Sequence, residues 1–425
     1  MRIALNAWFL DQPGTGSGQY LHNLLRAMLG IAPAHRFLLV APPGTPQSSF
    51  SAPEPVSYTV GTESPRPKSG SQHPHLEYWS PEAPPLQPEQ WRSNLGKLLF
   101  EQATFSQACR QWRADLAHVP YWGSPLRPPV PMVVTIHDLI PRLLPAYRGG
   151  PLVRLYTHLV SASARRARLV LTDSLASQRD IEVHLGLPPE RARCIYLAAA
   201  EQFEPNPEPA DEAIRAHYGL NPAALGTSRY VLYLAGHDLR KNVASLIEAF
   251  ATVSSCDDDV TLVIGGRLPD QSEPPFYDPR PLVEALAIAA DVRFIGWVEE
   301  GHKPALYRGA SCAVFPSRYE GFGLPVLEAL ACGTPLVASN TSSLPELIGD
   351  AGFALDPDDT RGMAGAILAC LVDEPLAAEL RRRGPQQAAQ FSWAQTARQT
   401  LAAYHEAASR LPAGAGSPRS GARWP

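Results

Sequence analysis

The chain has few cysteines and no long apolar run. Its six cysteines are scattered singly without a Cys-x-x-Cys pair, which excludes a disulfide scaffold and predicts a reducing compartment. No stretch reaches the ~18 consecutive apolar residues of a membrane helix. The first residues also lack the apolar segment of a secretory signal. We therefore expect a cytoplasmic protein whose only membrane contact is peripheral, on the inner face.

The chain also lacks an excess of either charge. The 37 lysines and arginines against 41 aspartates and glutamates give a formal net charge of -4, so nothing attracts nucleic acid to the chain as a whole. Any anionic ligand must be bound by local groups. The clearest basic cluster, Arg165–Arg168, is short. It fits either contact with an acidic membrane surface or a solvated helix end.

Length and apolar pattern indicate an α/β protein with two domains. The 425 residues, 45% of them hydrophobic, suffice for two cores. Short apolar runs alternate with longer amphipathic stretches, which is typical of parallel sheets covered by helices. We expect an N-terminal domain at 1–200 with a Pro-rich surface insertion at about 42–90, a linker at 201–209, a second domain at 210–390, and a C-terminal helix with a frayed tail at 391–425.

The individual elements follow from the same pattern. Strands are expected at 2–8, 37–41, 116–119, 132–136, 169–172, 194–197, 230–235, 260–264, 292–295, 312–315 and 336–338. Helices are expected at 19–29, 152–166, 177–185, 243–253, 281–290, 303–307, 324–331 and from 391 to about 409.

Two polar segments follow predicted strands of the first half. Gly14, Gly16 and Gly18 precede a helix, where a ligand could approach the backbone and the helix N-terminus favours an anion, although a tight turn explains them equally well. Their GxGxG spacing does not fit the GxGxxG of NAD-dependent oxidoreductases. His137 and Asp138 end a strand. We expect His137 to donate to a sugar hydroxyl or phosphate and Asp138 to orient it; the alternative is a histidine packed in its loop.

Two adjacent cations follow the first strand of the second half. Arg240 and Lys241 precede a predicted helix, where the helix dipole opposes positive charge. A diphosphate explains the pair, because a guanidinium grips two oxygens and an ammonium adds a point charge. The alternative is a solvated pair without function.

The most specific stretch is FPSRYEGFGLPVLEALACG at Phe315–Gly333. Glu320 lies in a strand-to-helix loop, and Glu328 falls eight residues later inside the helix. A carboxylate accepts two hydroxyl bonds at once, which suits a ribose diol. Gly321 and Gly323 leave the intervening amides open to an oxyanion or to sugar hydroxyls.

This stretch resembles the Glu-x7-Glu signature of the retaining glycosyltransferases of family 4, in their mannosyltransferase-rich branch. The segments at Leu98–Gln102, His137–Pro141, Arg240–Asn242 and Phe391–Trp393 are similar to that family as well, so the resemblance spans nearly the whole chain. It implies the GT-B fold: two facing Rossmann-like domains, a deep cleft between them, and a C-terminal helix that crosses back to the first domain. The implied substrate is a nucleotide-sugar donor.

The resemblance also assigns roles to single residues. It implies that Glu328 binds the donor ribose, that Glu320 lies against the transferred sugar, and that Lys241, with Arg240, neutralises the diphosphate. His137 lies near the transferred sugar. The backbone at Phe322, Gly323 and Leu324, and the glycine loop at Gly16 or Gly18, face sugar and phosphate. One departure is His237, which stands where many members have arginine, so phosphate binding depends more on Arg240 and Lys241.

The expected reaction is retaining transfer of a hexose, with mannose from GDP-mannose favoured, to a glycan or polyprenyl-linked acceptor. No metal or other cofactor is expected, because Asp257–Asp259, which matches a DxD motif, lies in a turn between helix and strand where acidic residues are ordinary. A GT-B nucleotide-sugar epimerase and a non-catalytic nucleotide-sugar-binding subunit remain alternatives. The latter is disfavoured because Glu320, His137 and Lys241 are all present.

Overall fold

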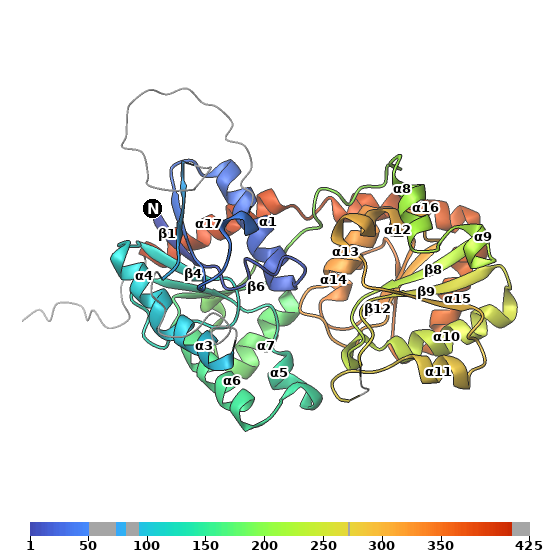
Figure 1. The fold of residues 1–425 in the computed structure, drawn as a ribbon, viewed down its shortest axis with the longest axis horizontal. Helices are drawn as coiled ribbons and strands as arrows, with labels where there is room; N and C mark the ends of the chain where they lie inside the picture. Colours follow the sequence, from blue (N-terminus) through green and yellow to red (C-terminus); the bar gives the residue numbers. More distant parts are fainter. Residues whose placement is uncertain (51–73, 82–92, 271–272, 410–425) are drawn as a thin grey trace, which may run out of the picture.

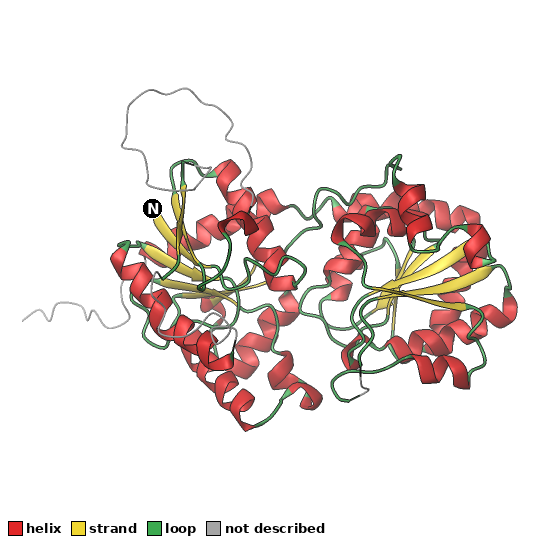
Figure 2. Ribbon diagram, viewed as in Figure 1, coloured by secondary structure: helices red, strands yellow, loops and turns green. Residues whose placement is uncertain are grey.

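The protein consists of two α/β domains, each with its own parallel sheet covered by helices on both faces (Figures 1 and 2). The computed structural model describes residues 1–50, 74–81, 93–270 and 273–409. The central strands, among them Leu116–Val119, Met132–Thr135, Leu169–Thr172 and Val260–Gly265, are buried on both faces, as continuous apolar runs require in a parallel sheet. The predicted α/β class and the pair of Rossmann-like domains are therefore confirmed.

The N-terminal sheet has seven strands in the order β3-β2-β1-β4-β5-β6-β7. Its strands are β1 (Arg2–Asn6), β2 (Arg36–Val40), β3 (Leu76–Trp79), β4 (Leu116–Val119), β5 (Met132–Thr135), β6 (Leu169–Thr172) and β7 (Ala192–Cys194). Its helices are α1 (Gly16–Ile31), α3 (Asn94–Leu99), α4 (Phe105–Gln111), α5 (Ile140–Leu143), α6 (Pro151–Ala164) and α7 (Leu175–Leu185). A π-helical turn at Phe100–Thr104 joins α3 to α4.

The C-terminal sheet has six strands in the order β10-β9-β8-β11-β12-β13. They are β8 (Arg229–Leu234), β9 (Val260–Gly265), β10 (Val292–Gly296), β11 (Cys312–Phe315), β12 (Leu336–Ser339) and β13 (Phe353–Leu355). The helices are α8 (Asp211–His217), α9 (Pro222–Leu225), α10 (Val243–Cys256), α11 (Arg280–Ala285), α12 (Lys303–Gly309), α13 (Leu324–Ala331), α14 (Leu344–Ile348), α15 (Thr360–Val372) and α16 (Glu374–Ala388).

The last helix, α17 (Trp393–Ser409), returns to the N-terminal domain, as predicted, and packs along α1 (Figure 1). Its Tyr404 is fully buried and its hydroxyl lies 2.6 Å from Nδ1 of His118 in β4. Thr396 donates a hydrogen bond to the carbonyl of Tyr196. The N-terminal domain is therefore completed by the end of the chain. None of the helices in the described ranges is long and apolar enough to cross a membrane.

Three predicted elements need correction. The Pro-rich stretch 42–90 is more than a surface insertion, because Leu76–Trp79 forms β3 and adds an edge strand beside β2; flanking prolines are tolerated at a sheet edge. Residues 51–73 and 82–90 of this stretch, and the predicted tail after Ser409, lie outside the described residues. The strand expected at 194–197 lies earlier, at Ala192–Cys194 (β7). The helix expected at 281–290 is shorter and ends at Ala285 (α11).

Candidate functional site

Residues that follow the carboxyl ends of strands from both sheets meet between the domains: Gly321, after β11, lies against His137, after β5, and Ser174, after β6. Open α/β sheets bind ligands at such strand ends. A cavity of about 150 Å³ opens there between α1 and the C-terminal domain. Its lining is drawn from both domains: Pro13, Gln19, His22, Asn23, Arg26, 198–200, Gln202, Phe203, Glu300, Leu324 and Glu328. Two of the predicted donor-binding residues, Leu324 and Glu328, therefore lie on one shared cavity.

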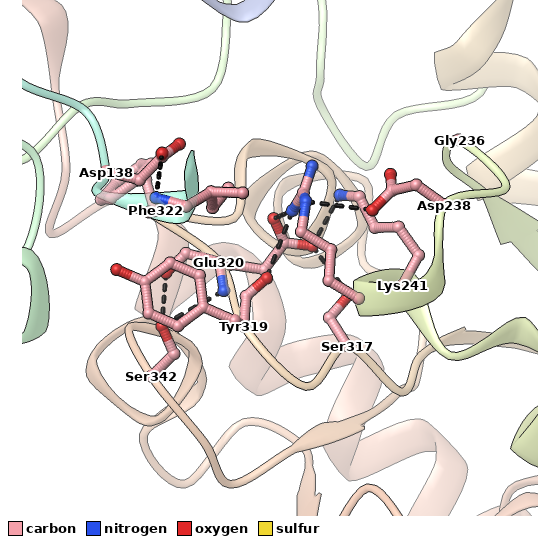
Figure 3. A network of polar contacts seen from close by, with 12 residues as sticks. Asp138, Gly236, Asp238, Lys241, Ser317, Tyr319, Glu320, Phe322 and Ser342 are labelled. Carbon is pink, nitrogen blue, oxygen red and sulfur yellow. Dashed lines mark hydrogen bonds and ion pairs between the residues drawn. The ribbon is translucent and has the colours of Figure 1, made fainter. Parts of the chain in front are cut away.

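Glu320 is held by two cations (Figure 3). Its Oε1 accepts hydrogen bonds from Lys241 Nζ at 2.6 Å and from Ser317 Oγ at 2.7 Å, and its Oε2 accepts one from Arg240 Nη1 at 2.6 Å. Burial alone would raise the pKa of Glu320, but Lys241 and Arg240 outweigh it and lower the pKa to about 2. The carboxylate is therefore an anion at every physiological pH.

The two cations precede helix α10, as predicted. Arg240 and Lys241 lie in a 3₁₀ turn at Leu239–Lys241, and Asn242, with φ of 55°, separates that turn from α10. Arg240 also pairs with Asp238 at 3.1 Å. Both cations are thus already compensated by acids of the chain. A diphosphate at this position would have to compete with Glu320 or share the cations with it.

His137 follows β5 as predicted, but its partner is not Asp138. Its Nδ1 lies 2.5 Å from Asp173 Oδ2, and its ring packs edge-on against Tyr20. Burial lowers the pKa of His137, but Asp173, together with the charge of Asp138 and a hydrogen bond to the backbone of Pro120, more than offsets this, so that the pKa is raised. Asp138 instead accepts the backbone N–H of Ile140 at 2.9 Å, so it caps the turn that begins α5. The prediction that Asp138 orients His137 was wrong.

Asp173 was missed, although a signal for it exists in the sequence. It directly follows β6, just as His137 follows β5, and the two strands are neighbours in the sheet. The rule that polar residues at adjacent strand ends meet would therefore have paired it with His137.

The glycine segment forms the first turn of α1. The helix begins at Gly16, and Thr15 caps it by accepting the N–H of Gly18 at 3.2 Å. A Cβ on Gly18 would lie 2.0 Å from the carbonyl oxygen of Gln12, so packing of the turn alone demands glycine there. A Cβ on Gly16 would meet nothing within 4 Å. Packing thus accounts for Gly18 and leaves Gly16 without a structural reason.

The loop that leads into α13 lies against the N-terminal domain. A Cβ on Gly321 would lie 2.5 Å from the carbonyl oxygen of His137, and Ser174 Oγ donates to the Gly321 carbonyl at 2.7 Å. Gly323, just before Leu324, has φ of 112°, which favours glycine. Phe322 between them is buried. The segment 321–324 therefore brings the Glu320 cluster next to His137.

Glu346 of the C-terminal domain forms hydrogen bonds to the N-terminal domain close to this loop. Its carboxylate accepts the N–H groups of Leu175 and Ala176 at 2.9 and 2.8 Å, at the N-terminus of α7, and the hydroxyl of Tyr196 at 2.9 Å. An anion is favoured at a helix N-terminus. The C-terminal domain thus supplies the group that satisfies the first amides of α7.

Glu328 lies on α13 in very different surroundings. It is buried, with Tyr307 Oη at 3.3 Å and Lys303 Nζ at 3.7 Å as its polar neighbours. Burial raises its pKa to about 7, which Lys303 opposes and Glu300 reinforces. Lys303 and Tyr307 were not predicted as site residues, and no short motif marks either of them.

The two remaining sequence features have structural partners. His237 is buried with its ring packed against that of Tyr233, the centroids 6.1 Å apart. Asp257 and Asp259 both pair with Arg229, at 2.9 and 3.6 Å. Among the described residues, no group of three or more His, Cys, Asp or Glu side chains is placed to hold a metal ion.

Two facing parallel-sheet domains with a polar site between their strand ends are the architecture of the GT-B class. The family described as "Glycosyl transferases group 1" matches residues 221–387, and the "Glycosyl transferase 4-like domain" matches residues 15–198. The chain is 33% identical over 298 residues to the O-antigen chain mannosyltransferase B of Escherichia coli, covering 70% of this chain and 76% of that protein. The chain therefore belongs to the family 4 glycosyltransferases.

Solved structures share the fold. Sucrose-phosphate synthase of Thermosynechococcus elongatus aligns with a TM-score of 0.70 at 22% identity, over 96% of this chain and 98% of that one. Anabaena HepE in complex with UDP-glucose aligns with a TM-score of 0.66 at 20% identity, over 96% and 100%. At these identities the likeness concerns the fold alone.

Proposed function

We propose that this glycosyltransferase transfers mannose from GDP-mannose, with retention of configuration, to a glycan or polyprenyl-linked acceptor, without a metal ion. The observation that carries the proposal is the meeting of two charged clusters across the domain interface. Lys241 and Arg240 converge on Glu320 from the C-terminal side. His137 with Asp173 approaches from the N-terminal side, against the backbone of Gly321.

The cations suit the leaving group. Lys241 Nζ and Arg240 Nη1 both lie within hydrogen-bond distance of one carboxylate, so they also suit the oxygens of one diphosphate. When the donor binds, its diphosphate forms ion pairs with Lys241 and Arg240 in place of some of their contacts with Glu320. The Glu320 carboxylate then turns toward the hydroxyls of the transferred sugar. The amides near Gly323 and Leu324, and the N-terminus of α1 at Gly16 and Gly18, complete the phosphate contacts.

The donor nucleoside occupies the cavity between α1 and α13. Glu328 lines that cavity and accepts the ribose hydroxyls. Phe322 places its backbone between ribose and sugar, and Leu324 contributes apolar surface to the cavity wall. His137, held by Asp173, donates to a hydroxyl of the transferred sugar.

The step itself needs no protein nucleophile. The bond between the anomeric carbon and the diphosphate oxygen breaks, and its electron pair goes to that oxygen. The acceptor oxygen bonds to the anomeric carbon from the same face, and its proton passes to the leaving diphosphate. Lys241 and Arg240 stabilise the charge that develops on the diphosphate, which is where preorganised cations contribute most. Holding donor and acceptor together supplies the rest.

Mannose is favoured because the E. coli relative is called a mannosyltransferase. The HepE structure was solved with UDP-glucose, so a donor other than GDP-mannose is the alternative that must be tested directly.

The test is thermal-shift screening of the full chain, with and without EDTA, against GDP-mannose, UDP-glucose, dTDP-rhamnose, NAD and the free nucleotides. Stabilisation by GDP-mannose and GDP is expected. Stabilisation by a different nucleotide-sugar would replace the donor, and loss of binding with EDTA would overturn metal independence.

The reaction type needs a second readout. Proton NMR of the mixture with a mannose-terminated oligosaccharide should show a product with the anomeric configuration of the donor. Conversion of the donor sugar to an epimer, without transfer, would identify an epimerase. Binding without any turnover on glycan or polyprenyl-linked acceptors would identify a non-catalytic subunit.

A further inference from the structure

A turn of the N-terminal domain reaches the two cations of the C-terminal domain. Tyr147 ends the 3₁₀ turn Pro145–Tyr147, which follows α5. Its hydroxyl donates a hydrogen bond to Asp238 Oδ1 and accepts one from the backbone N–H of Arg240 at 3.0 Å. Figure 1 shows α5 on the side of the N-terminal domain that faces the C-terminal domain. One phenol therefore joins the two domains beside the proposed diphosphate site.

The same phenol acts on both the backbone and the side chain of Arg240. It reaches the guanidinium through Asp238, whose Oδ1 lies 3.1 Å from Arg240 Nε. Glu320 Oε2 and the carbonyl oxygen of Tyr319 accept hydrogen bonds from Arg240 Nη1, at 2.6 and 3.2 Å. The third nitrogen, Nη2, takes part in none of these contacts. Nη2 is therefore the group that can meet a phosphate oxygen while the rest of the guanidinium stays in place.

Lys241 is held by groups of its own domain. Its ammonium donates to Glu320 Oε1 at 2.6 Å, and its backbone N–H donates to the carbonyl of Asp238 at 2.9 Å. Neither contact crosses the domain interface. The placement of Arg240 thus involves a residue of the N-terminal domain, whereas these contacts of Lys241 do not.

The hydroxyl of Tyr147 keeps the proton that it donates. Partial burial raises the pKa of Tyr147, and the hydrogen bond to the Asp238 carboxylate raises it further. A hydroxyl can donate one hydrogen bond and accept others, and here both capacities are used. A hydrogen bond to a carboxylate is stronger than one between neutral groups. Without the hydroxyl, Asp238 could turn away and the guanidinium that it holds could move with it.

We propose that Tyr147 is a positioning residue for the transfer reaction, which holds Arg240, directly and by way of Asp238, in the orientation that binds the donor diphosphate. This role rests on the proposed function, in which Arg240 stabilises the leaving diphosphate. Arg240 then binds phosphate fully only while the two domains lie as they do in the structure. Lys241, held within its own domain, binds phosphate whether or not the domains are in contact.

Kinetics of the variant Tyr147→Phe test the proposal. The substitution keeps the ring and removes the hydroxyl. We expect kcat for transfer from GDP-mannose to a mannose-terminated oligosaccharide to fall about tenfold, the effect of losing one hydrogen bond to a charged group. The affinity for GDP, measured by titration calorimetry, should fall as well, because GDP carries the diphosphate that Arg240 binds.

Coupling to Arg240 distinguishes a positioning residue from a structural one. In a chain that carries Arg240→Gln, adding Tyr147→Phe should lower kcat by about twofold at most, because the group that Tyr147 positions is already gone. In a chain that carries Lys241→Gln, the same addition should still lower kcat about tenfold. A loss of equal size in the unaltered, Arg240→Gln and Lys241→Gln chains would overturn the proposal.

Two other tyrosine variants are matched controls. Tyr319→Phe removes a second hydroxyl from the domain interface, which donates to Asp180 Oδ2 at 2.7 Å. Arg240 bonds to the backbone carbonyl of Tyr319, so any loss in this variant should be the same with and without Arg240→Gln. Tyr78→Phe removes a hydroxyl that donates to the Thr45 carbonyl in the N-terminal domain, and kcat should be unchanged. Coupling of Tyr319→Phe to Arg240→Gln as strong as that of Tyr147→Phe would assign the effect to the interface as a whole and overturn the proposal.

Failure of this role and failure of the proposed function give different results. If the unaltered chain transfers mannose and Tyr147→Phe does so at the same rate, the proposed function stands and the role of Tyr147 is overturned. If the unaltered chain neither binds GDP nor transfers mannose, and UDP-glucose does not replace the donor, the proposed function fails and the role of Tyr147 fails with it. A loss in Tyr147→Phe that disappears in the Arg240→Gln chain supports the role with either donor.

Discussion

Glu320 and Glu328 belong to one loop-helix unit and are both buried, yet their surroundings move their pKa values in opposite directions. Burial raises the pKa of each. At Glu320, two cations at 2.6 Å overcome that effect and bring the pKa to about 2. At Glu328, one ammonium at 3.7 Å does not, and the pKa rises to about 7.

The difference shows that the spacing of the motif places the two glutamates in the fold, whereas the residues around each carboxyl determine its protonation state. Lys241 and Arg240 reach Glu320 from a turn about 80 residues earlier in the chain, through the packing of β8 beside β11. Glu328 faces the phenol of Tyr307 on α12. One glutamate is thus a fixed anion beside Lys241 and Arg240, and the other changes protonation near neutral pH.

Replacing Lys241 by alanine should have the largest effect, because it removes one of the two cations that we propose to stabilise the leaving diphosphate. We expect kcat to fall by about 10²–10³-fold, the scale for losing one preorganised group that stabilises transition-state charge. Steady-state kinetics measure this loss, and thermal unfolding of the same variant provides the control. The loss of kcat can be converted to an activation free energy. If the free energy of unfolding fell by as much, Lys241 would be a structural cation and not one that acts on the leaving group.

The opposite behaviour of Glu328 should appear in the pH dependence of stability. A carboxyl whose folded pKa is raised stabilises the fold fully below its ordinary pKa of 4.5, and this contribution is lost as pH rises toward about 7. Its loss should cost about 1–3 kcal/mol. Glu320, with its lowered pKa, contributes above 4.5 and loses that contribution only toward about 2.

Urea unfolding between pH 4.5 and 8 measures this difference. Glu328→Gln, which cannot ionise, should flatten the decline in that range, whereas Glu299→Gln at the exposed surface should leave it as it is. An unchanged slope in Glu328→Gln would mean that Glu328 is already ionised and that its surroundings resemble those of Glu320 more closely than the structure indicates.

Much of the fold could be predicted because apolar runs and strand-end polar residues are local signals. The strands around Val133 and Val314 are continuous apolar runs, and their buried positions follow from them. Strand β3 was missed because Leu76–Trp79 is short and lies among prolines. Its pairing with β2 is a tertiary contact that propensity does not reveal.

The site divides in the same way. His137, Lys241 and Glu320 stand out because their local patterns are unusual. The pairings within the site cannot be recognised from local patterns, because they join distant parts of the sequence. Lys241 and Glu320 are 79 residues apart, and Glu346 and Ala176, at the N-terminus of α7, are 170 residues apart. Of these pairings, only that of Asp173 with His137 could have been predicted, because both residues follow the ends of neighbouring parallel strands. Charge states depend on such distant pairs, so they could not be predicted from motif spacing.

Lys303 offers the smallest change that sharpens the contrast. Its ammonium lowers the pKa of Glu328, so Lys303→Met should raise that pKa further, by up to about one unit. The decline in stability with pH should then extend above 7, while Lys303→Arg, which keeps the charge, should retain the original profile. Urea unfolding at closely spaced pH values resolves the shift. If Lys303→Met left the profile in place, the 3.7 Å contact would be too weak to affect Glu328, and burial alone would account for its protonation.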